Sequence, residues 1–160
     1  MKLGATDWSA ILDPAGPWSA LVAANSVPDA IARHAVGLVY LTGPYAEGVT
    51  QGGRWRFERS VEAETRAAIA LHALAMAGCT AVSPVVMWSA MAQASGVLSR
   101  RDRVDPLDAG AWARWCAPIR AAAGLVAVHC VPGWRISVAV MDDVGWALER
   151  NVPVHFLGAA

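Results

Sequence analysis

The sequence has little of what marks secreted, membrane-spanning or disulfide-stabilised proteins. Its three cysteines (Cys79, Cys116 and Cys130) are odd in number, widely spaced and without a C-x-x-C pair, so they predict no disulfide framework. No apolar run approaches the roughly 18 residues that span a bilayer. No apolar stretch precedes a cleavage-like site near the N-terminus, so we expect no secretory signal and place the protein in the reducing cytoplasm.

Charge of one sign is also missing. Lys2 is the only lysine, and twelve arginines and thirteen acids complete a formal net charge of 0 at pH 7. Nucleic acids and anionic membranes are bound through a basic surplus, which this sequence lacks. We therefore expect no general nucleic-acid binding and no membrane partner, although arginine suits the bidentate binding of single anions.

Several chemical signatures do not occur. The sequence has no P-loop, no G-x-G-x-x-G, no nucleophile elbow and no H-E-x-x-H. Its four histidines show no metal-ligand spacing. These absences argue against the common nucleotide hydrolases and dinucleotide-binding enzymes, and we expect no metal and no other cofactor.

The sequence contains enough apolar residues to form one buried hydrophobic core. The 160 residues are 56% hydrophobic and include eight tryptophans. Four apolar runs have the length of buried strands: Val36–Leu41, Cys79–Ser83, Leu125–Val131 and Val152–Leu157. Helical patterns lie between them, over Arg54–Ala77, Trp88–Gly96, Leu107–Ala123 and Ser137–Arg150, with Pro118 either kinking the third or starting it. This alternation predicts an α/β three-layer sandwich with a four- to five-stranded parallel sheet, flavodoxin-like or Rossmann-like.

Residues 1–35 stand outside this alternation. They are too apolar for a free tail, and Pro28 follows Ser26-Val27 as at the start of a short helix. We expect a helical N-terminal extension that packs on the α/β domain, residues 36–160, or on a second subunit.

Two segments follow the first two predicted strands at the same edge of the sheet. Gly43 and Pro44 turn the chain sharply and would aim Tyr45 over the crevice, where a ring can stack on a planar base. Ser83 ends the second strand, and Trp88 could cover a ligand pocket. The alternatives are an ordinary β–α turn at the first segment and a packed tryptophan at the second.

The segment after the third strand carries the acid on which the functional interpretation depends. Ser137 can cap the following helix, Arg135 can pair with an anion such as a 5′-phosphate, and Asp143 lies near the second helical turn. Asp143 could be a nucleophile or could accept a hydroxyl. The alternative for Asp142 and Asp143 is a favourable interaction with the helix dipole.

Together, YLTGPY at residues 40–45, SP at 83–84 and the GW..S.....D..WA pattern from residue 133 resemble the nucleoside 2-deoxyribosyltransferase-like superfamily, and most of all its uncharacterised DUF1937 branch. The resemblance covers about residues 36–158. It implies that a carboxylate on the helix after the third strand attacks C1′ of a nucleoside, as in retaining glycosidases. Asp143 occupies that position, one methylene shorter than the superfamily's Glu, and Gly43, Tyr45 and Ser137 match substrate-contacting positions.

The sequence departs from the superfamily where other acids are expected. Cys116 and Gly124 stand at two such positions, and residues 112–123 contain no carboxylate. The resemblance therefore implies either an N-glycosidic-bond hydrolase or transferase acting on a nucleoside or nucleoside 5′-monophosphate, or a nucleotide-binding protein that has lost its chemistry. An interaction protein using the tryptophan-rich N-terminus is a third hypothesis. The resemblance also implies a homodimer or higher oligomer.

Overall fold

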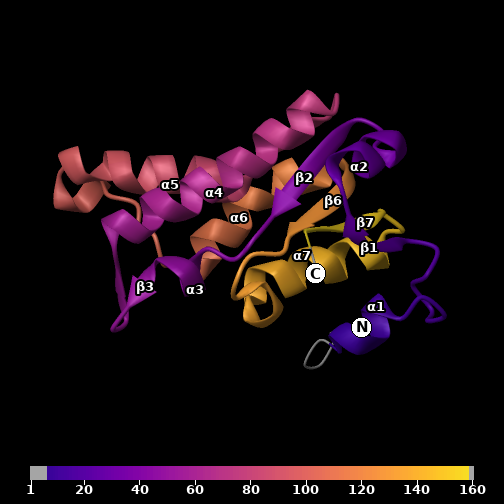
Figure 1. Cartoon of the computed structure of the whole chain (residues 1–160). Helices are drawn as coiled ribbons and strands as arrows, with labels where there is room; N and C mark the ends of the chain where they lie inside the picture. Colours follow the sequence, from indigo (N-terminus) through magenta and orange to yellow (C-terminus); the bar gives the residue numbers. More distant parts are fainter. Residues whose placement is uncertain (1–6, 159–160) are drawn as a thin grey trace.

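The computed structural model describes residues 7–158, so the first six residues of the predicted extension and the last two of the predicted α/β domain lie outside it. Its main sheet has five parallel strands in the order β1-β7-β6-β2-β5 (Figure 1). These strands are β1 (Val22–Ser26), β2 (Leu38–Thr42), β5 (Thr80–Val82), β6 (Ala123–His129) and β7 (Val154–Leu157). The predicted α/β fold with a parallel sheet is confirmed.

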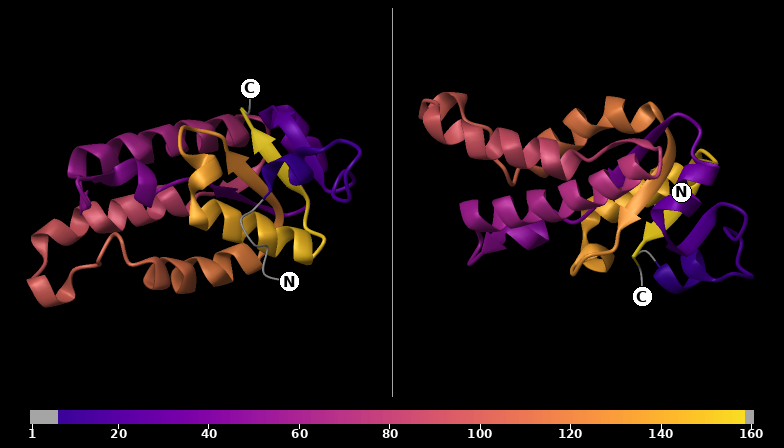
Figure 2. Two further views of the ribbon diagram at one scale, coloured as in Figure 1. Left: turned by 90° about the horizontal axis from the view of Figure 1, so that it is seen from below. Right: turned by 45° about the horizontal axis from the view of Figure 1, so that its top comes forward.

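The helices cover both faces of the sheet and make it the middle of three layers (Figure 2). In chain order they are α1 (Trp8–Leu12), α2 (Pro28–His34), α3 (Ala46–Val49), α4 (Phe57–Met76), α5 (Pro84–Ala94), α6 (Ala109–Ala121) and α7 (Val138–Glu149). Short 3-10 turns are η1 (Ser95–Val97), η2 (Arg100–Asp102) and η3 (Trp134–Ile136). Pro118 lies inside α6, so that helix does not begin there.

Strand alternation divides the core between the two faces, because successive side chains of a strand point to opposite sides. Val39 and Leu41 of β2 pack with residues of α2 and α4. Tyr40, between them, packs with residues of α6 and α7. The sequence YLT at the end of β2 therefore directs Tyr40 and Thr42 toward α7, and this placement builds the site described below.

The N-terminal segment contributes more than the helices predicted for it. Its strand β1 pairs with β7 and forms one edge of the sheet, with Val22 opposite Val154 and Ser26 opposite Leu157. The indole N–H of Trp8 donates to the Arg135 carbonyl at 2.7 Å. Within the described residues the extension is therefore packed on the α/β domain and completes its sheet. The strand has the sequence VAANS, which lacks the apolar run that revealed the others.

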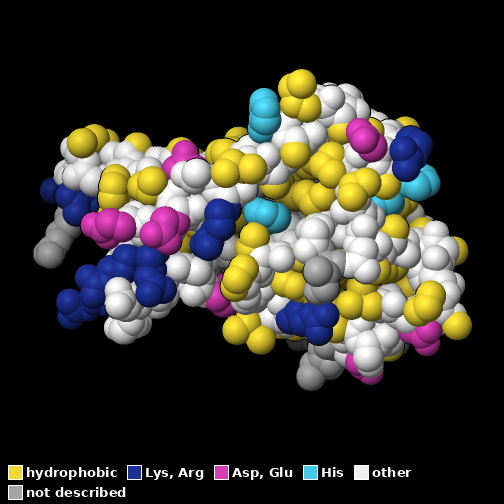
Figure 3. All heavy atoms as spheres, viewed as in Figure 1, with side chains coloured by type: hydrophobic (Ala, Val, Ile, Leu, Met, Phe, Trp, Pro, Cys, Tyr) yellow, Lys and Arg dark blue, Asp and Glu magenta, His cyan; other side chains and the backbone are white. Residues whose placement is uncertain are grey.

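Helices α4 and α5 run beyond the sheet as an arm (Figure 1). Near the outer end of the arm, β3 (Thr50–Gln51) and β4 (Arg54–Trp55) form an antiparallel hairpin, so the helix predicted over Arg54–Ala77 begins only at Phe57. Arginine side chains gather over this hairpin (Figure 3), where Arg54, Arg56 and Arg59 are exposed. A third apolar cluster, including Val49, Ala67 and Trp88, holds the arm together.

Hydropathy gives no sign of a membrane span in this fold. Among residues 7–158, no helix combines the length and the apolar character needed to cross a bilayer.

Candidate functional site

The candidate site lies where the strand order reverses. The chain passes from β2 outward to β5 on one side, then returns across β2 to β6 on the other. Open α/β sheets bind ligands at such a switch point, at the carboxyl ends of the strands, because the two loops diverge there. Here the divergent loops follow Thr42 of β2 and His129 of β6.

Asp143 occupies the α7 side of this switch point. Its side chain is turned into the protein and the residue is only 4% exposed. One carboxylate oxygen, Oδ2, accepts the Thr42 hydroxyl at 2.6 Å, and the other, Oδ1, pairs with Arg120 at 2.6 Å. Of the roles left open by the sequence, accepting a hydroxyl is the one that the structure shows. Because the acid is buried and lies beyond the first helical turn, the helix dipole does not account for it.

The surroundings of Asp143 act on its protonation in opposite directions. Burial raises the pKa of Asp143 above its ordinary value, and the contacts with Thr42 and Arg120 lower it. Tyr40 and Cys116 lie next to the carboxylate. Burial, with a smaller contribution from the Asp143 charge, raises the pKa of Tyr40, and burial raises that of Cys116 to about 12. Both neighbouring side chains are therefore protonated and uncharged at physiological pH.

The loop after β6 approaches the loop after β2 at the switch point. A Cβ built on Gly133, in the loop after β6, would lie 3.8 Å from the Glu47 Cβ and 4.0 Å from the Pro44 Cβ. Gly133 has φ +93°, a left-handed conformation that favours glycine. Because Asp143 is only 4% exposed, a ligand reaches its carboxylate only when the surrounding residues move.

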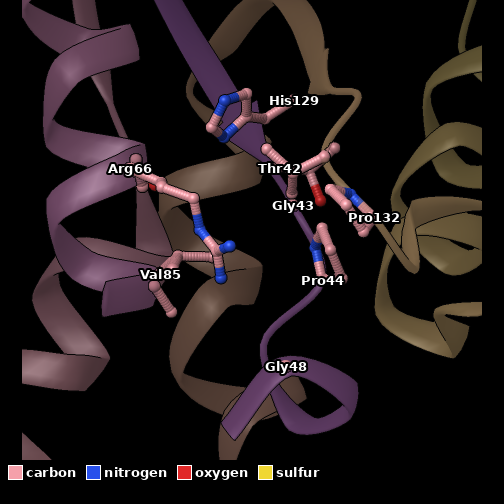
Figure 4. Close-up of a pocket in the computed structure, with 12 residues that line it drawn as sticks. Thr42, Gly43, Pro44, Gly48, Arg66, Val85, His129 and Pro132 are labelled. Atoms are coloured by element: carbon pink, nitrogen blue, oxygen red, sulfur yellow. The ribbon is translucent and has the colours of Figure 1, made fainter. Parts of the chain in front are cut away.

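On the opposite face of the sheet, the same strand ends line a small pocket, which we call the rim pocket (Figure 4). Its walls come from the loops after β2 and β6 and from α4 and α5: Thr42, Gly43, Pro44, Gly48, Ala63, Arg66, Ala67, Ser83, Val85, His129, Val131 and Pro132. Its cavity volume of about 20 Å³ is room for one or two water-sized groups. Thr42 both lines this pocket and donates to Asp143, so the two features adjoin.

The rim pocket is lined by a cation and by neutral polar groups. Arg66 extends from α4 toward Gly43 and Pro44 (Figure 4). Burial, with the nearby Arg66 charge, lowers the pKa of His129, so its imidazole is neutral at pH 7. The Ser83 hydroxyl is buried and has no hydrogen-bond partner. This arrangement offers donors and positive charge with no carboxylate among the lining residues.

A second, more apolar pocket flanks the other side of the loop after β2. Its volume is about 120 Å³, and it is lined by Tyr45, Ala46, Glu47, Pro106, Leu107, Asp108, Ala109, Trp112, Ala113, Val138, Ala139 and Asp142. Ala139 lies one turn before Asp143 on α7, so this pocket also adjoins the buried carboxylate.

The structure places Tyr45 and Trp88 in the interior. The Tyr45 ring is 3% exposed and stacks on Trp112 with centroids 5.5 Å apart. Its hydroxyl accepts the Trp55 indole N–H at 3.0 Å and lies 3.2 Å from the Ser60 hydroxyl. The Trp88 indole is buried against Trp112 and donates to a backbone carbonyl. Tyr45 still borders the second pocket with an edge, and Trp88 supports its wall through Trp112.

The remaining predicted residues divide between the two faces and the surface. Gly43, Pro44 and Ser83 line the rim pocket. Ser137 stands at the N-cap of α7, fully buried, but its hydroxyl makes no capping bond and has no partner. Arg135 lies over the Trp134 ring at 5.0 Å and lines neither the rim pocket nor the second pocket.

Sequence reasoning missed five residues of the site: Tyr40, Thr42, Arg66, Arg120 and His129. Strand alternation within YLT could have placed Tyr40 and Thr42 on one face. Arg66 and Arg120 come from the middle of α4 and the end of α6. No local pattern relates Arg66 to Ser83, 17 positions away, or Arg120 to Asp143, 23 positions away.

Residues 7–158 contain no set of metal ligands. Among residues 7–158, no three side chains of His, Cys, Asp or Glu gather as they would around a metal ion.

Comparison with known proteins gives one match. A family model described as "Domain of unknown function (DUF1937)" covers residues 37–159. Neither the curated proteins nor the solved structures contain a match to this sequence.

Proposed function

We propose that this chain, which belongs to the DUF1937 family of unknown function, cleaves or transfers the N-glycosidic bond of a nucleoside or nucleoside 5′-monophosphate, with Asp143 as the nucleophile. The observation that carries this proposal is a single buried carboxylate at the switch point of the sheet, with both oxygens oriented by fixed donors. The reaction class comes from the resemblance to the nucleoside 2-deoxyribosyltransferase-like superfamily.

The surroundings of Asp143 suit a carboxylate nucleophile. Burial raises the pKa of Asp143, and the contacts with Thr42 and Arg120 oppose this rise by favouring the charged form, which is the one that attacks. In the first step one Asp143 oxygen bonds to C1′ while the C1′–N bond breaks, and its electron pair leaves with the base, which takes a proton from water. In the second step water, or the N–H of another base, attacks C1′ while the bond from C1′ to the Asp143 oxygen breaks and returns its electron pair to the carboxylate. The proton lost by the attacking group neutralises the hydroxide that the first step left behind.

One observation favours a second candidate, nucleotide binding without turnover. Both oxygens of Asp143 are already engaged, and the residue is only 4% exposed. In addition, α6 offers no second acid to protonate a leaving base, since Cys116 with its raised pKa stands where the resemblance places one.

The deciding experiment measures release of free base. We would incubate purified protein with the common ribo- and deoxyribonucleosides and their 5′-monophosphates and separate the products by chromatography. Release that is lost in Asp143→Asn but kept in Glu149→Gln supports the proposal. Glu149 is a matched control because it is a carboxylate of the same helix whose arginine contact, Arg150, is at the surface. Ligand-dependent thermal stabilisation without base release would favour binding alone.

Two further proposals lie outside the site. We propose a homodimer or higher oligomer, which the resemblance implies, and a cytoplasmic location with no nucleic-acid or membrane partner, which the cysteine usage and the charge balance of the sequence suggest. Sedimentation equilibrium of the purified chain tests the assembly, and a monomer across micromolar concentrations would contradict it.

A further inference from the structure

We infer that the rim pocket is an anion subsite that selects phosphorylated substrates, with Arg66 and Ser83 as its phosphate-binding residues. The inference deepens the proposed function and rests on it for taking the anion to be the phosphate of a nucleotide. It moves the phosphate from Arg135, which the sequence suggested, to the opposite face of the sheet edge.

Charge is the first support. Arg66 is the cation among the residues that line this pocket, and no carboxylate accompanies it there. Neither ion pair found among the described residues involves Arg66. Its guanidinium is turned toward Gly43 and Pro44, across the mouth of the pocket (Figure 4). An arginine in such a place is free to form a bidentate contact with two oxygens of one anion.

The second support is a hydroxyl that lacks a partner. Ser83 is 1% exposed, lines the pocket, and its Oγ makes no hydrogen bond. It occupies the N-cap of the eleven-residue helix α5, yet its side chain makes no capping bond. Buried hydroxyl groups without partners are uncommon, because the lost hydration is uncompensated. A ligand oxygen in the pocket would supply the missing partner, near the positive end of the α5 dipole.

Size and neighbours narrow the ligand to a small anionic group. A volume of about 20 Å³ does not hold a nucleobase, but it has room for one or two oxygens of a phosphate whose remaining atoms lie outside the cavity. His129, neutral because burial and Arg66 lower its pKa, offers an uncharged ring nitrogen at the same wall. The pocket adjoins Asp143 through Thr42, which borders the pocket and donates to the carboxylate. A phosphate bound here would therefore anchor a nucleotide at the edge of the sheet beside the proposed nucleophile.

Binding of three probes tests the subsite: inorganic phosphate, the four common deoxynucleosides, and their 5′-monophosphates, each titrated by calorimetry. We expect monophosphates to bind more tightly than the matching nucleosides. Arg66→Gln should weaken monophosphate and phosphate binding about 10- to 100-fold, as expected for a lost charge-assisted contact, and leave nucleoside binding unchanged. The affinity for monophosphates should also fall with added salt, because Arg66 is exposed.

Matched variants separate the subsite from general charge. Arg59→Gln, which removes an exposed arginine of the same helix outside the pocket, and Arg135→Gln should both leave monophosphate affinity unchanged. Ser83→Ala should weaken phosphate binding without lowering the melting temperature, because the hydroxyl makes no bond in the free protein. Gly43→Ala fits sterically, with its Cβ 3.5 Å from the His129 Cβ, and should weaken binding by narrowing the cavity.

The two proposals fail in different ways. Equal monophosphate affinity in the unaltered protein and in Arg66→Gln, or a loss caused by Arg135→Gln alone, would overturn the subsite. Base release from unphosphorylated nucleosides would in that case leave the proposed reaction standing. Arg66-dependent monophosphate binding without any base release would overturn the reaction and retain the subsite.

Discussion

A 2.6 Å hydrogen bond joins the hydroxyl of Thr42 to the carboxylate of Asp143, 101 positions away in the sequence, at the point where the strand order of the sheet reverses. The bond joins the end of strand β2 to α7, the helix that follows the central strand β6. It also connects the two faces of the sheet edge, since Thr42 borders the rim pocket on the other side. A change at either face can therefore reach the buried acid through one side chain.

Removing the partner of this acid should destabilise the fold. We expect Arg120→Met to lower the free energy of unfolding by about 3 kcal/mol, because it leaves a buried carboxylate unpaired. The double variant Arg120→Met/Asp143→Asn should recover part of that loss. Urea denaturation measures both. Arg150→Met is the control: like Arg120, Arg150 lies over the Trp146 ring and contacts a carboxylate, but at the surface, so its loss should cost under about 1 kcal/mol.

Acid should weaken the fold through a buried histidine. The Nδ1 atom of His155 lies 2.9 Å from the Ser26 hydroxyl oxygen. The centroids of the His155 and His34 rings are 5.2 Å apart. Burial, with the His34 charge, lowers the pKa of His155 below its ordinary 6.5. The unfolded chain then binds the proton first, so stability is full above pH 6.5 and falls as the pH drops below it.

Comparing variants isolates that contribution. The free energy of unfolding of His155→Gln should depend less on pH between 7 and 5 than that of the unaltered protein. Part of the slope should remain, because burial also lowers the pKa of His129. His72→Gln, at an exposed histidine, should leave the slope unchanged. An identical slope in all three proteins would show that His155 is not the group that titrates.

Gly124 should tolerate no side chain. A Cβ there would lie 1.8 Å from the Val36 carbonyl oxygen, and the pairing of β6 with β2 skips this residue between Ala123 and Leu125. We expect Gly124→Ala to cost about 3 kcal/mol or more in unfolding free energy, or to prevent folding. Thermal denaturation of both variants measures the effect. Gly96→Ala, where no atom lies within 4 Å of the added Cβ, should be close to neutral in this measurement.

Trp8 should anchor the N-terminal segment. Its ring packs edge-on against Trp134 and Phe156, with centroids 4.9 and 6.1 Å away. We expect Trp8→Ala to lower the unfolding free energy by about 2–3 kcal/mol and to speed proteolysis of the segment. Trp8→Phe keeps an apolar ring and loses the bond to the Arg135 carbonyl, so it should cost about 1 kcal/mol. Equal losses in the two variants would contradict a packing role for the ring.

The parts of this fold that the sequence revealed are those with a strong local pattern. The apolar runs that became β2, β5, β6 and β7, and the helical spacing of α4 and α7, are periodic over several residues and were predicted correctly. Strand β1 was not predicted, because its sequence VAANS has half-exposed and polar residues and its conformation depends on pairing with β7. The β3–β4 hairpin escaped because two-residue strands carry no periodicity.

The site was predictable only where one segment contains it. The sequence identified Asp143, Gly43 and Ser83 from the residues that follow buried strands. It could not show that Arg120 would pair with Asp143, or that Arg66 would border the same edge, because those contacts depend on how helices cross the sheet. It also could not show that position 124 has no room for a side chain, which the structure explains through the close approach of the Val36 carbonyl.

The pairing of β1 with β7 has a consequence for synthesis. Ser26 and Leu157 are neighbours in the sheet although 131 positions separate them in the sequence. Pairings of such long range form slowly, because a long stretch of chain has to close before they are made. Until β7 has been synthesised, β1 has no partner strand, so the synthesis of β7 sets the earliest moment at which this edge of the sheet can form.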